Sequence, residues 1–198
     1  KYMFPAEVKL SKKKTILVEL DEGVTPTTAE GLAKLPPAEK GGIHSFGAQT
    51  FPADGNVGFI VTNRERAKEL SANKDVEIQI ISYGYSRVNP GFMASAPVPA
   101  AQMALANADL KITDMKAIKS HNPFTTNDLN FAKKFNIDVM KMNNYGSSLV
   151  YGHPQAPTAG RIIAEMLEEM VLIGGGYCLW AGCAAGDTGA SMIFKVTC

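Results

Sequence analysis

The chain has 198 residues, of which 45% are hydrophobic and 20% are charged, and its formal net charge is +1. This composition is that of a soluble globular protein rather than a disordered one, and the balanced charge gives no field that would attract nucleic acid or an anionic membrane. No apolar stretch approaches the roughly 18 residues of a membrane-spanning helix. Three cysteines, an odd number, do not suggest a disulfide framework, so we expect a reducing, cytoplasmic setting.

The first part of the chain predicts short elements separated by turns. Thr27-Thr28-Ala29-Glu30 is a capping-box pattern that opens a helix, and Pro36 and Pro37 end it. A run of apolar residues at Val57–Thr62 is typical of a buried strand. The expected elements are strands at 8–10 and 15–20, a helix at 27–35, a buried strand at 57–62 and a polar helix at 64–70.

The second part predicts longer elements. Asp75–Tyr83 alternates apolar and polar residues, which indicates a strand, and Gly160–Leu172 carries an apolar stripe at helical spacing. The other expected elements are helices at 100–106 and 126–135 and strands at 115–118, 177–181 and 190–196. Strands that alternate with helices predict a layered α/β fold.

The first candidate site is His153, which lies between Gly152 and Pro154 just before a predicted helix. Glycine permits close approach of the backbone and proline stiffens it, so such a loop can direct an imidazole into a pocket. Taken alone, these three residues favour an ordinary structural histidine.

The second candidate site is the small-residue turn Gly182–Gly189, between two predicted strands. Small residues let backbone N–H groups approach a ligand, as an oxyanion hole requires. Cys183 at the start of this turn can act as a nucleophile or a proton donor, or it can be a buried, inert cysteine. We expect Cys178 and Cys198 to be inert.

The third candidate site is His121, where a predicted strand gives way to a helix. A lone histidine at such a place is usually an ordinary hydrogen-bonded residue. His44 has no supporting context, and we expect it to be structural.

The order and spacing of these three sites resemble the thiolase family over essentially the whole chain. The family motif N-x-x-G-G followed by G-H-P-x-G-x-S-G-x-R corresponds to residues 143–147 and 152–161, and its closing motif C-x-G-G-G-x-G to residues 183–189. The usual N-E-A-F position holds His121-Asn122-Pro123-Phe124, which is similar to the histidine-bearing subgroup that includes the thiolases linked to sterol carrier proteins. Further matches are Thr27–Leu35, an altered segment at Gly47–Asn56, and Met93 with Pro97–Ala100.

The resemblance implies the thiolase layered αβαβα fold and acyl exchange between coenzyme A thioesters, with no metal and no covalently bound cofactor. Cys183 would be the second, proton-shuttling cysteine, and His153 would activate the nucleophilic cysteine. His121 would take the place of an asparagine that holds a water in many members. The remaining positions carried over are the backbone N–H of Ala185 in an oxyanion hole, Asn143 and Gly152 as structural support, and Thr50 near the coenzyme A tail.

The nucleophilic cysteine of the family lies in an N-terminal half to which nothing in this sequence corresponds. That half is either part of a longer polypeptide, which the opening Lys1-Tyr2-Met3-Phe4-Pro5 favours, or a separate subunit. We therefore expect residues 1–42 to be the end of a loop domain, 43–73 the last strand and helix of the N-terminal domain, and 74–198 the C-terminal domain. A large uncovered face predicts a partner chain or a homo-oligomer.

Five residues replace glycine or small residues of the family motifs, namely Ala156, Pro157, Ala159, Ala185 and Asp187. Methyl groups crowd a site that relies on close backbone approach, which suggests an altered acyl substrate, and the Asp187 carboxylate is expected to raise the pKa of Cys183. The alternative function is a non-catalytic thiolase-like subunit that binds acyl-CoA or acts as a scaffold. A decarboxylating ketoacyl synthase is disfavoured, because those enzymes carry histidine or asparagine in place of Cys183.

Overall fold

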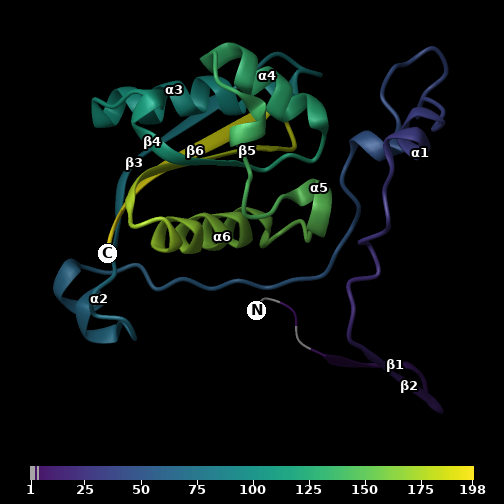
Figure 1. Ribbon diagram of the computed structural model, residues 1–198, viewed down its shortest axis with the longest axis horizontal. Helices are drawn as coiled ribbons and strands as arrows, with labels where there is room; N and C mark the ends of the chain where they lie inside the picture. Colours follow the sequence, from purple (N-terminus) through teal and green to yellow (C-terminus); the bar gives the residue numbers. More distant parts are fainter. Residues whose placement is uncertain (1–2, 4) are drawn as a thin grey trace.

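The computed structural model describes residue 3 and residues 5–198. Lys1, Tyr2 and Phe4, which belong to the opening segment that favours a longer polypeptide, lie outside the described residues. Residues 5–73 hold a hairpin and three short helical segments. The hairpin and the first helix extend away from the rest of the chain, whereas the last helix lies near the sheet (Figure 1). These elements are β1 (Ala6–Ser11), β2 (Lys14–Val18), α1 (Ala29–Ala33), η1 (Phe46–Ala48) and α2 (Arg64–Leu70).

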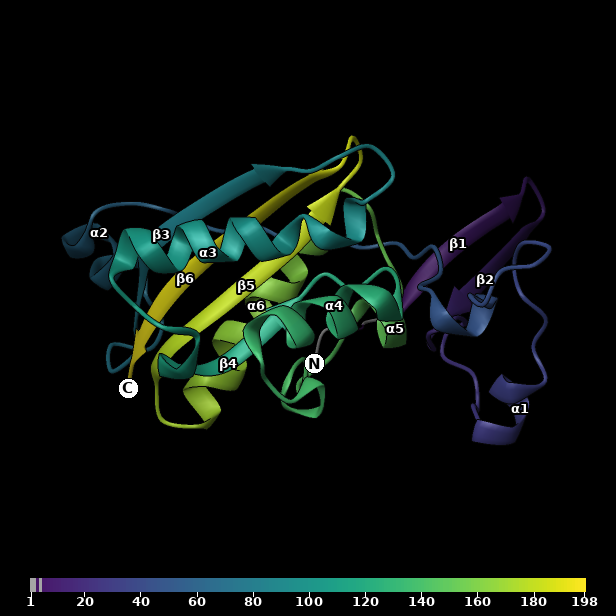
Figure 2. The same ribbon diagram turned by 90° about the horizontal axis from the view of Figure 1, so that it is seen from above.

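Residues 74–198 form a sheet with helices on both faces, which confirms the predicted α/β class (Figures 1 and 2). Its strands are β3 (Glu77–Arg87), β4 (Met115–Ser120), β5 (Gly176–Ala184) and β6 (Thr188–Thr197). Its α-helices are α3 (Pro97–Ala108), α4 (Thr125–Phe135), α5 (Ser148–Tyr151) and α6 (Thr158–Leu172), with 3₁₀ turns η2 (Met93–Ser95), η3 (Ile112–Asp114) and η4 (Val139–Lys141).

The sheet has the strand order β3-β6-β5-β4, in which β4 and β5 are parallel and the other neighbours antiparallel. Ser120 at the end of β4 lies opposite Ala181 in β5. The next residue, His121, continues this pairing, and its backbone N–H donates to the carbonyl of Ala181 at 2.8 Å. Because parallel strands end at the same edge of a sheet, His121 and Cys183 come to one edge.

Two clusters of buried side chains lie on the two faces of the sheet, between α3 with α4 on one side and α6 on the other. Along β5, Leu179 belongs to the first cluster, whereas Cys178 and Trp180 belong to the second, as the two-residue period of a strand requires. The apolar stripe of α6 includes Ile162 and Met166, both fully buried, and each such side chain contributes roughly 1.5–3 kcal/mol.

The predicted buried strand at Val57–Thr62 is wrong. The segment is extended but carries no strand hydrogen bonds, and Ile60 and Val61 are 77% and 74% exposed. It runs beside α6, where Val57 and Phe59 lie close to Gly160 (Figure 1). A strand needs a neighbouring strand to satisfy its backbone groups, and no other described segment pairs with this one.

Helix starts follow the caps that the sequence encodes. The hydroxyl of Thr28 accepts the N–H of Gly31 at 3.0 Å, so α1 begins at Ala29, two residues later than predicted, and it ends at Ala33 rather than Leu35. The polar helix α2 has the predicted bounds and is capped by Asn63. None of the helices in the described residues combines the length and apolar character that crossing a bilayer requires.

Candidate active site

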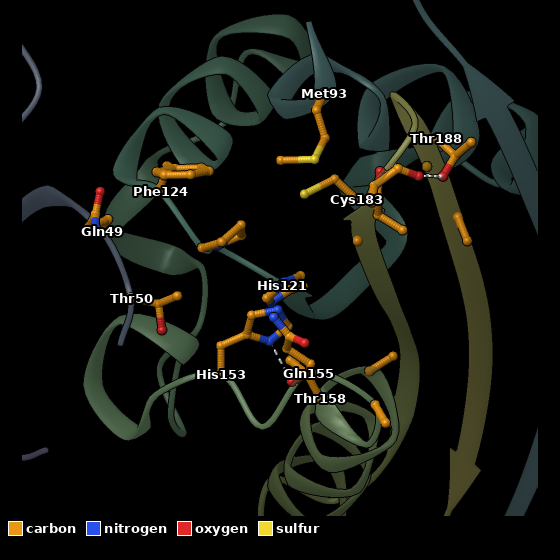
Figure 3. A pocket seen from close by; sticks show the side chains of 18 of the residues that line it. Gln49, Thr50, Met93, His121, Phe124, His153, Gln155, Thr158, Cys183 and Thr188 are labelled. Atoms are coloured by element: carbon orange, nitrogen blue, oxygen red, sulfur yellow. Dashed lines mark hydrogen bonds between the residues drawn. The ribbon is translucent and has the colours of Figure 1, made fainter. Parts of the chain in front are cut away.

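A cavity of about 1130 Å³ opens at the edge of the sheet where β4 and β5 end (Figure 3). Its lining brings together residues that are far apart in the sequence, from the N-terminal region, the loop after β4, the loop before α6 and the turn after β5. The predicted site residues among them are Thr50, His121, His153, Cys183 and Ala185.

His121 is 6% exposed and its Nδ1 lies 3.0 Å from the hydroxyl oxygen of Ser148. Burial, together with smaller contributions from His153 and Arg161, lowers the pKa of His121 to about 4. The imidazole is therefore neutral at pH 7 and lines the cavity, where the His153 ring lies 4.4 Å away between centroids.

His153 is held in a loop that only glycine allows. Gly152 has a φ of 77°, and a side chain there would meet Phe51 and Ala53 at 2.8 Å. The Nδ1 of His153 lies 2.6 Å from the hydroxyl of Thr158, the first residue of α6. Burial lowers the pKa of His153, and Arg161 adds to this effect, so this imidazole is also neutral at pH 7.

Cys183 is 9% exposed and faces the cavity across from the two histidines (Figure 3). The amide Nδ2 of Asn127 donates to its sulfur at 3.3 Å. Burial raises the pKa of the Cys183 thiol, and the bond from Asn127 opposes that rise.

The prediction that Asp187 raises this pKa is wrong. Its carboxylate accepts the backbone N–H of Gly91 at 3.0 Å, and the residue closes the turn with a φ of 59°. The carboxylate is therefore committed to the loop after β3, and burial accounts for the raised pKa of Cys183.

A buried network of polar side chains holds the His121 loop. Asp128 accepts from Asn122 at 2.7 Å, from Asn143 at 3.1 Å and from the hydroxyl of Ser120. Asn122 in turn accepts the backbone N–H of Ser148 at 3.1 Å. Asn143 also accepts the N–H of Ser120 at 2.8 Å, so it ties two sides of the loop together.

A buried ionic cluster lies beside the loop that precedes His153. Lys119 is fully buried, and its Nζ donates to the carbonyl of Gly146 at 2.8 Å and lies 3.6 Å from Glu165. Glu165 also lies 3.6 Å from Nε of Arg161. Burial lowers the pKa of Lys119 and raises that of Glu165.

The segment 49–53 connects both histidine loops. The N–H of Thr50 donates to the carbonyl of Pro123 at 2.8 Å, and the carbonyl of Phe51 accepts the N–H of His153 at 2.8 Å. The Thr50 hydroxyl donates to the carbonyl of Ser148. Thr50 thus lies in the cavity wall as part of the support for both histidines.

The remaining residues named in the sequence analysis have the following positions. Ala185 lies in the exposed turn at its rim, whereas Cys178 is buried in the core against α6, where burial raises its pKa to about 12. Cys198 is exposed at the end of the chain, and the His44 ring lies 5.4 Å from that of Phe124 in an edge contact.

Sequence reasoning missed Asn127, Ser148 and Thr158 as partners of the reactive groups. Asn127 stands three residues after Phe124, at the capping position of α4, which is a local signal for an oriented amide. No local pattern marks the bond of Ser148 to His121, because the two residues are 27 positions apart.

Comparison with known proteins identifies the family of this chain. The family model described as the thiolase C-terminal domain matches residues 74–196. The human mitochondrial 3-ketoacyl-CoA thiolase is 32% identical over 98% of this chain, and an acetyl-CoA acetyltransferase of Syntrophomonas wolfei is 32% identical over 96%. The chain spans about half the length of these relatives, 49% and 48% respectively.

Solved structures show the same architecture. The crystal structure of human mitochondrial 3-ketoacyl-CoA thiolase superposes with a TM-score of 0.81 at 29% identity, covering 98% of this chain and 49% of that one. The acetyl-CoA acetyltransferase of Bacillus anthracis gives 0.82 at 25% identity, with coverage of 98% and 49%. The fold is that of the C-terminal half of a thiolase, and the chain belongs to the thiolase family.

Proposed function

We propose that this chain supplies the C-terminal part of a thiolase active site, which cleaves 3-ketoacyl-CoA or joins two acyl-CoAs once an N-terminal half provides the nucleophilic cysteine. One observation carries the proposal: His121, His153 and Cys183 converge on a single cavity of about 1130 Å³. Acyl transfer through a cysteine needs a base and a proton shuttle, and these residue types provide them.

In the cleavage direction, the neutral His153 takes the thiol proton of the nucleophilic cysteine, whose thiolate attacks the ketone carbon of the substrate. The bond to the neighbouring carbon then breaks, which leaves an acyl-cysteine and the enolate of acetyl-CoA, and the enolate carbon takes a proton from Cys183. The Cys183 thiolate next takes the proton of a coenzyme A thiol, which attacks the acyl-cysteine. Acyl-CoA leaves, and the proton on His153 returns to the cysteine sulfur.

Two sets of donors are proposed to stabilise the oxygen anions of this reaction. Each such donor is worth about 3 kcal/mol in the transition state. His121, whose lowered pKa keeps it neutral, and His153, which then carries the proton taken from the nucleophilic cysteine, donate to the enolate oxygen from their second nitrogens. The backbone N–H of Ala185 serves the oxyanion on the other side, and Thr50 lies toward the coenzyme A tail.

The length of the chain and its exposed apolar surface support the proposal that an N-terminal half completes it. The chain spans 49% of the human relative, and the extended segment 57–61 leaves Phe59, Ile60 and Val61 exposed. We propose that residues 1–42 end a loop domain, that 43–73 complete the N-terminal domain and that 74–198 form the C-terminal one. Whether the other half belongs to the same polypeptide or to a separate subunit is decided by the intact mass of the purified protein.

We further propose a subgroup, a ligand, an assembly and a location for this protein. His121-Asn122-Pro123-Phe124 favours the histidine-bearing subgroup similar to thiolases linked to sterol carrier proteins. We propose acyl-CoA as the ligand and a homo-oligomer as the assembly, with no metal or covalently bound cofactor. A cytoplasmic location is proposed from the cysteine content, although the relatives include proteins named as mitochondrial and peroxisomal.

Reconstitution tests the proposal. The chain is produced together with an N-terminal thiolase half, and thiolysis of acetoacetyl-CoA and of longer 3-ketoacyl-CoAs is followed by the loss of enolate absorbance. Cys183→Ala is expected to lower kcat by at least about 10³-fold, because the proton shuttle is lost. Cys198→Ala, which changes an exposed cysteine, is the matched control and is expected to retain full activity.

Either of two results overturns the catalytic proposal. Unchanged exchange in Cys183→Ala removes the role given to that thiol. A reconstituted complex that binds acyl-CoA but exchanges no acyl group, with any chain length, favours the alternative of a non-catalytic acyl-CoA-binding or scaffold subunit.

A further inference from the structure

The amide of Asn127 is the side-chain donor that the structure places on the sulfur of Cys183. Asn127 is 2% exposed, and its Nδ2 lies 3.3 Å from Sγ. The two residues are 56 positions apart, on α4 and at the end of β5, so the contact depends on how α4 packs over the sheet.

The orientation of this amide is fixed from its other end. The Oδ1 of Asn127 accepts the backbone N–H of Phe124 at 3.3 Å, which is the cap of α4. Since an amide carries its oxygen and nitrogen on opposite sides, this bond leaves Nδ2 directed at the sulfur. The helix cap therefore also sets which atom Cys183 meets.

A buried thiol that acts in turn as proton donor and proton acceptor must become a thiolate, and burial disfavours this charged form. In the resting site, burial favours the neutral thiol, and the two histidines that line the same cavity are neutral at pH 7, so neither offers a positive charge to a Cys183 thiolate. A hydrogen bond to a charged acceptor is stronger than one to a neutral acceptor, so an N–H directed at Sγ favours the thiolate.

We propose that Asn127 is a catalytic residue that stabilises the thiolate of Cys183 during each proton transfer. The inference rests on the proposed function, because it names the group that lets Cys183 lose its proton to the enolate carbon and regain one from the coenzyme A thiol. Asn127 itself gains and loses no proton; it donates one hydrogen bond throughout.

The test measures the acidity of Cys183 without any thioester. The full 198-residue chain is alkylated with iodoacetamide between pH 6 and pH 11, and the modified Cys183 peptide is quantified by mass spectrometry. The thiolate displaces iodide, so the pH dependence of the rate reports the pKa of Cys183. Asn127→Asp keeps the oxygen that caps α4 and removes the donor, whereas Asn127→Leu removes the donor without adding a charge.

We expect both variants to raise the alkylation pKa of Cys183 by about one pH unit or more, since one hydrogen bond to a charged group has this magnitude. Asn130→Asp, one turn further along α4, is the matched control for an added carboxylate and is expected to change the pKa less than Asn127→Asp. Circular dichroism confirms that each variant retains its helix content.

Two outcomes overturn the inference: an unchanged pKa in Asn127→Leu, or equal shifts in Asn127→Asp and Asn130→Asp, which would indicate a charge effect alone. In the reconstituted enzyme, Asn127→Asp is expected to lower kcat about tenfold with KM little changed. If the wild-type complex exchanges no acyl groups, the proposed function fails, and the alkylation profile still decides the role of Asn127.

Discussion

All buried side chains of the described residues lie between Ser82 and Val196, whereas residues 5–73 expose apolar side chains such as Leu20 and Ile60. The later part closes its own core on both faces of a sheet. The earlier part has comparable apolar residues but no second layer to cover them. Contacts within this chain account for the core of residues 74–198, whereas the described residues leave much of the apolar surface of the earlier part uncovered.

Two kinds of contact join the two parts, namely backbone hydrogen bonds beside the cavity and an exposed ion pair. Segment 49–53 bonds to both histidine loops through backbone groups, next to the cavity. Helix α2 meets β3 through the exposed ion pair of Arg64 with Glu77. The cavity of the candidate site is therefore lined mainly by the folded part, with segment 49–53 of the exposed part in its wall.

The largest contrast is expected from one matched pair of substitutions. Ile162→Ala, in the buried stripe of α6, leaves a cavity and is expected to lower the free energy of unfolding by about 4 kcal/mol. Ile60→Ala, at a side chain that is 77% exposed, is expected to change it by less than about 0.5 kcal/mol. Urea unfolding of the 198-residue chain measures both, and a comparable loss in Ile60→Ala would disprove the division between the two parts.

The same Ile60→Ala variant also tests whether segment 57–61 contacts the proposed N-terminal half. If segment 57–61 is covered by that half, the substitution weakens the assembly while the isolated chain is unaffected. Equal affinity of wild type and variant for the N-terminal half, measured by calorimetry, would place the partner surface elsewhere.

The next largest change in the free energy of unfolding is expected at the buried ionic cluster of Lys119, Arg161 and Glu165. Lys119→Met keeps the length of the side chain but removes the bond to Gly146 and the charge that faces Glu165, so we expect a loss of about 3 kcal/mol. Lys116→Met, at an exposed position of the same strand, is the matched control and is expected to lie within about 0.5 kcal/mol of wild type. Similar unfolding curves for the two variants would show that the buried ammonium contributes nothing.

The pH dependence of stability is expected to come from the folded part through His121. Its pKa is about 4 in the folded chain and 6.5 as the ordinary value, so between these values the unfolded chain binds a proton that the folded chain excludes. Stability is therefore lost as pH falls from 6.5 toward 4, by about 2.5 kcal/mol at pH 4.5 from this residue.

His121→Asn isolates this effect, because the raised pKa values of Asp128 and Glu165, which favour folding at lower pH, are present in both proteins. Between pH 6.5 and pH 4.5 the wild type is expected to lose about 2 kcal/mol more than the variant. Parallel pH curves from denaturant titrations would contradict the exclusion of a proton from His121.

Sequence patterns predicted the folded part well and the exposed part unevenly, since α2 has the predicted bounds but Val57–Thr62 is not a strand. The stripe in α6 and the alternation in β3 are local signals, so both elements were predicted within a few residues of their bounds. Val57–Thr62 has the composition of a strand, but a strand is a property of two paired segments, and the chain described here provides one.

The site shows the same division. Motif spacing predicted that His121, His153 and Cys183 act together, and the fold places them around one cavity. The side chains that contact them, Asn127 on Cys183 and Ser148 on His121, are 56 and 27 positions away, and no local pattern encodes such contacts. The role assigned to Asp187 was wrong because its carboxylate faces Gly91, which spacing alone does not reveal.

The smallest effect is expected at the exposed contact between the two parts. Arg64 lies 2.6 Å from Glu77, but its side chain is 68% exposed, and Lys68 also lies 3.7 Å from the same carboxylate. Solvent screens such a pair and the second cation replaces part of it, so Arg64→Ala is expected to lower Tm by no more than about 2 °C. Scanning fluorimetry at low salt and in about 1 M NaCl, where the Debye length is about 3 Å, should show this small difference disappear. A decrease of several degrees that persists in salt would mean that α2 is held to the sheet by more than its charges, and that the exposed part is less independent of the core than its burial indicates.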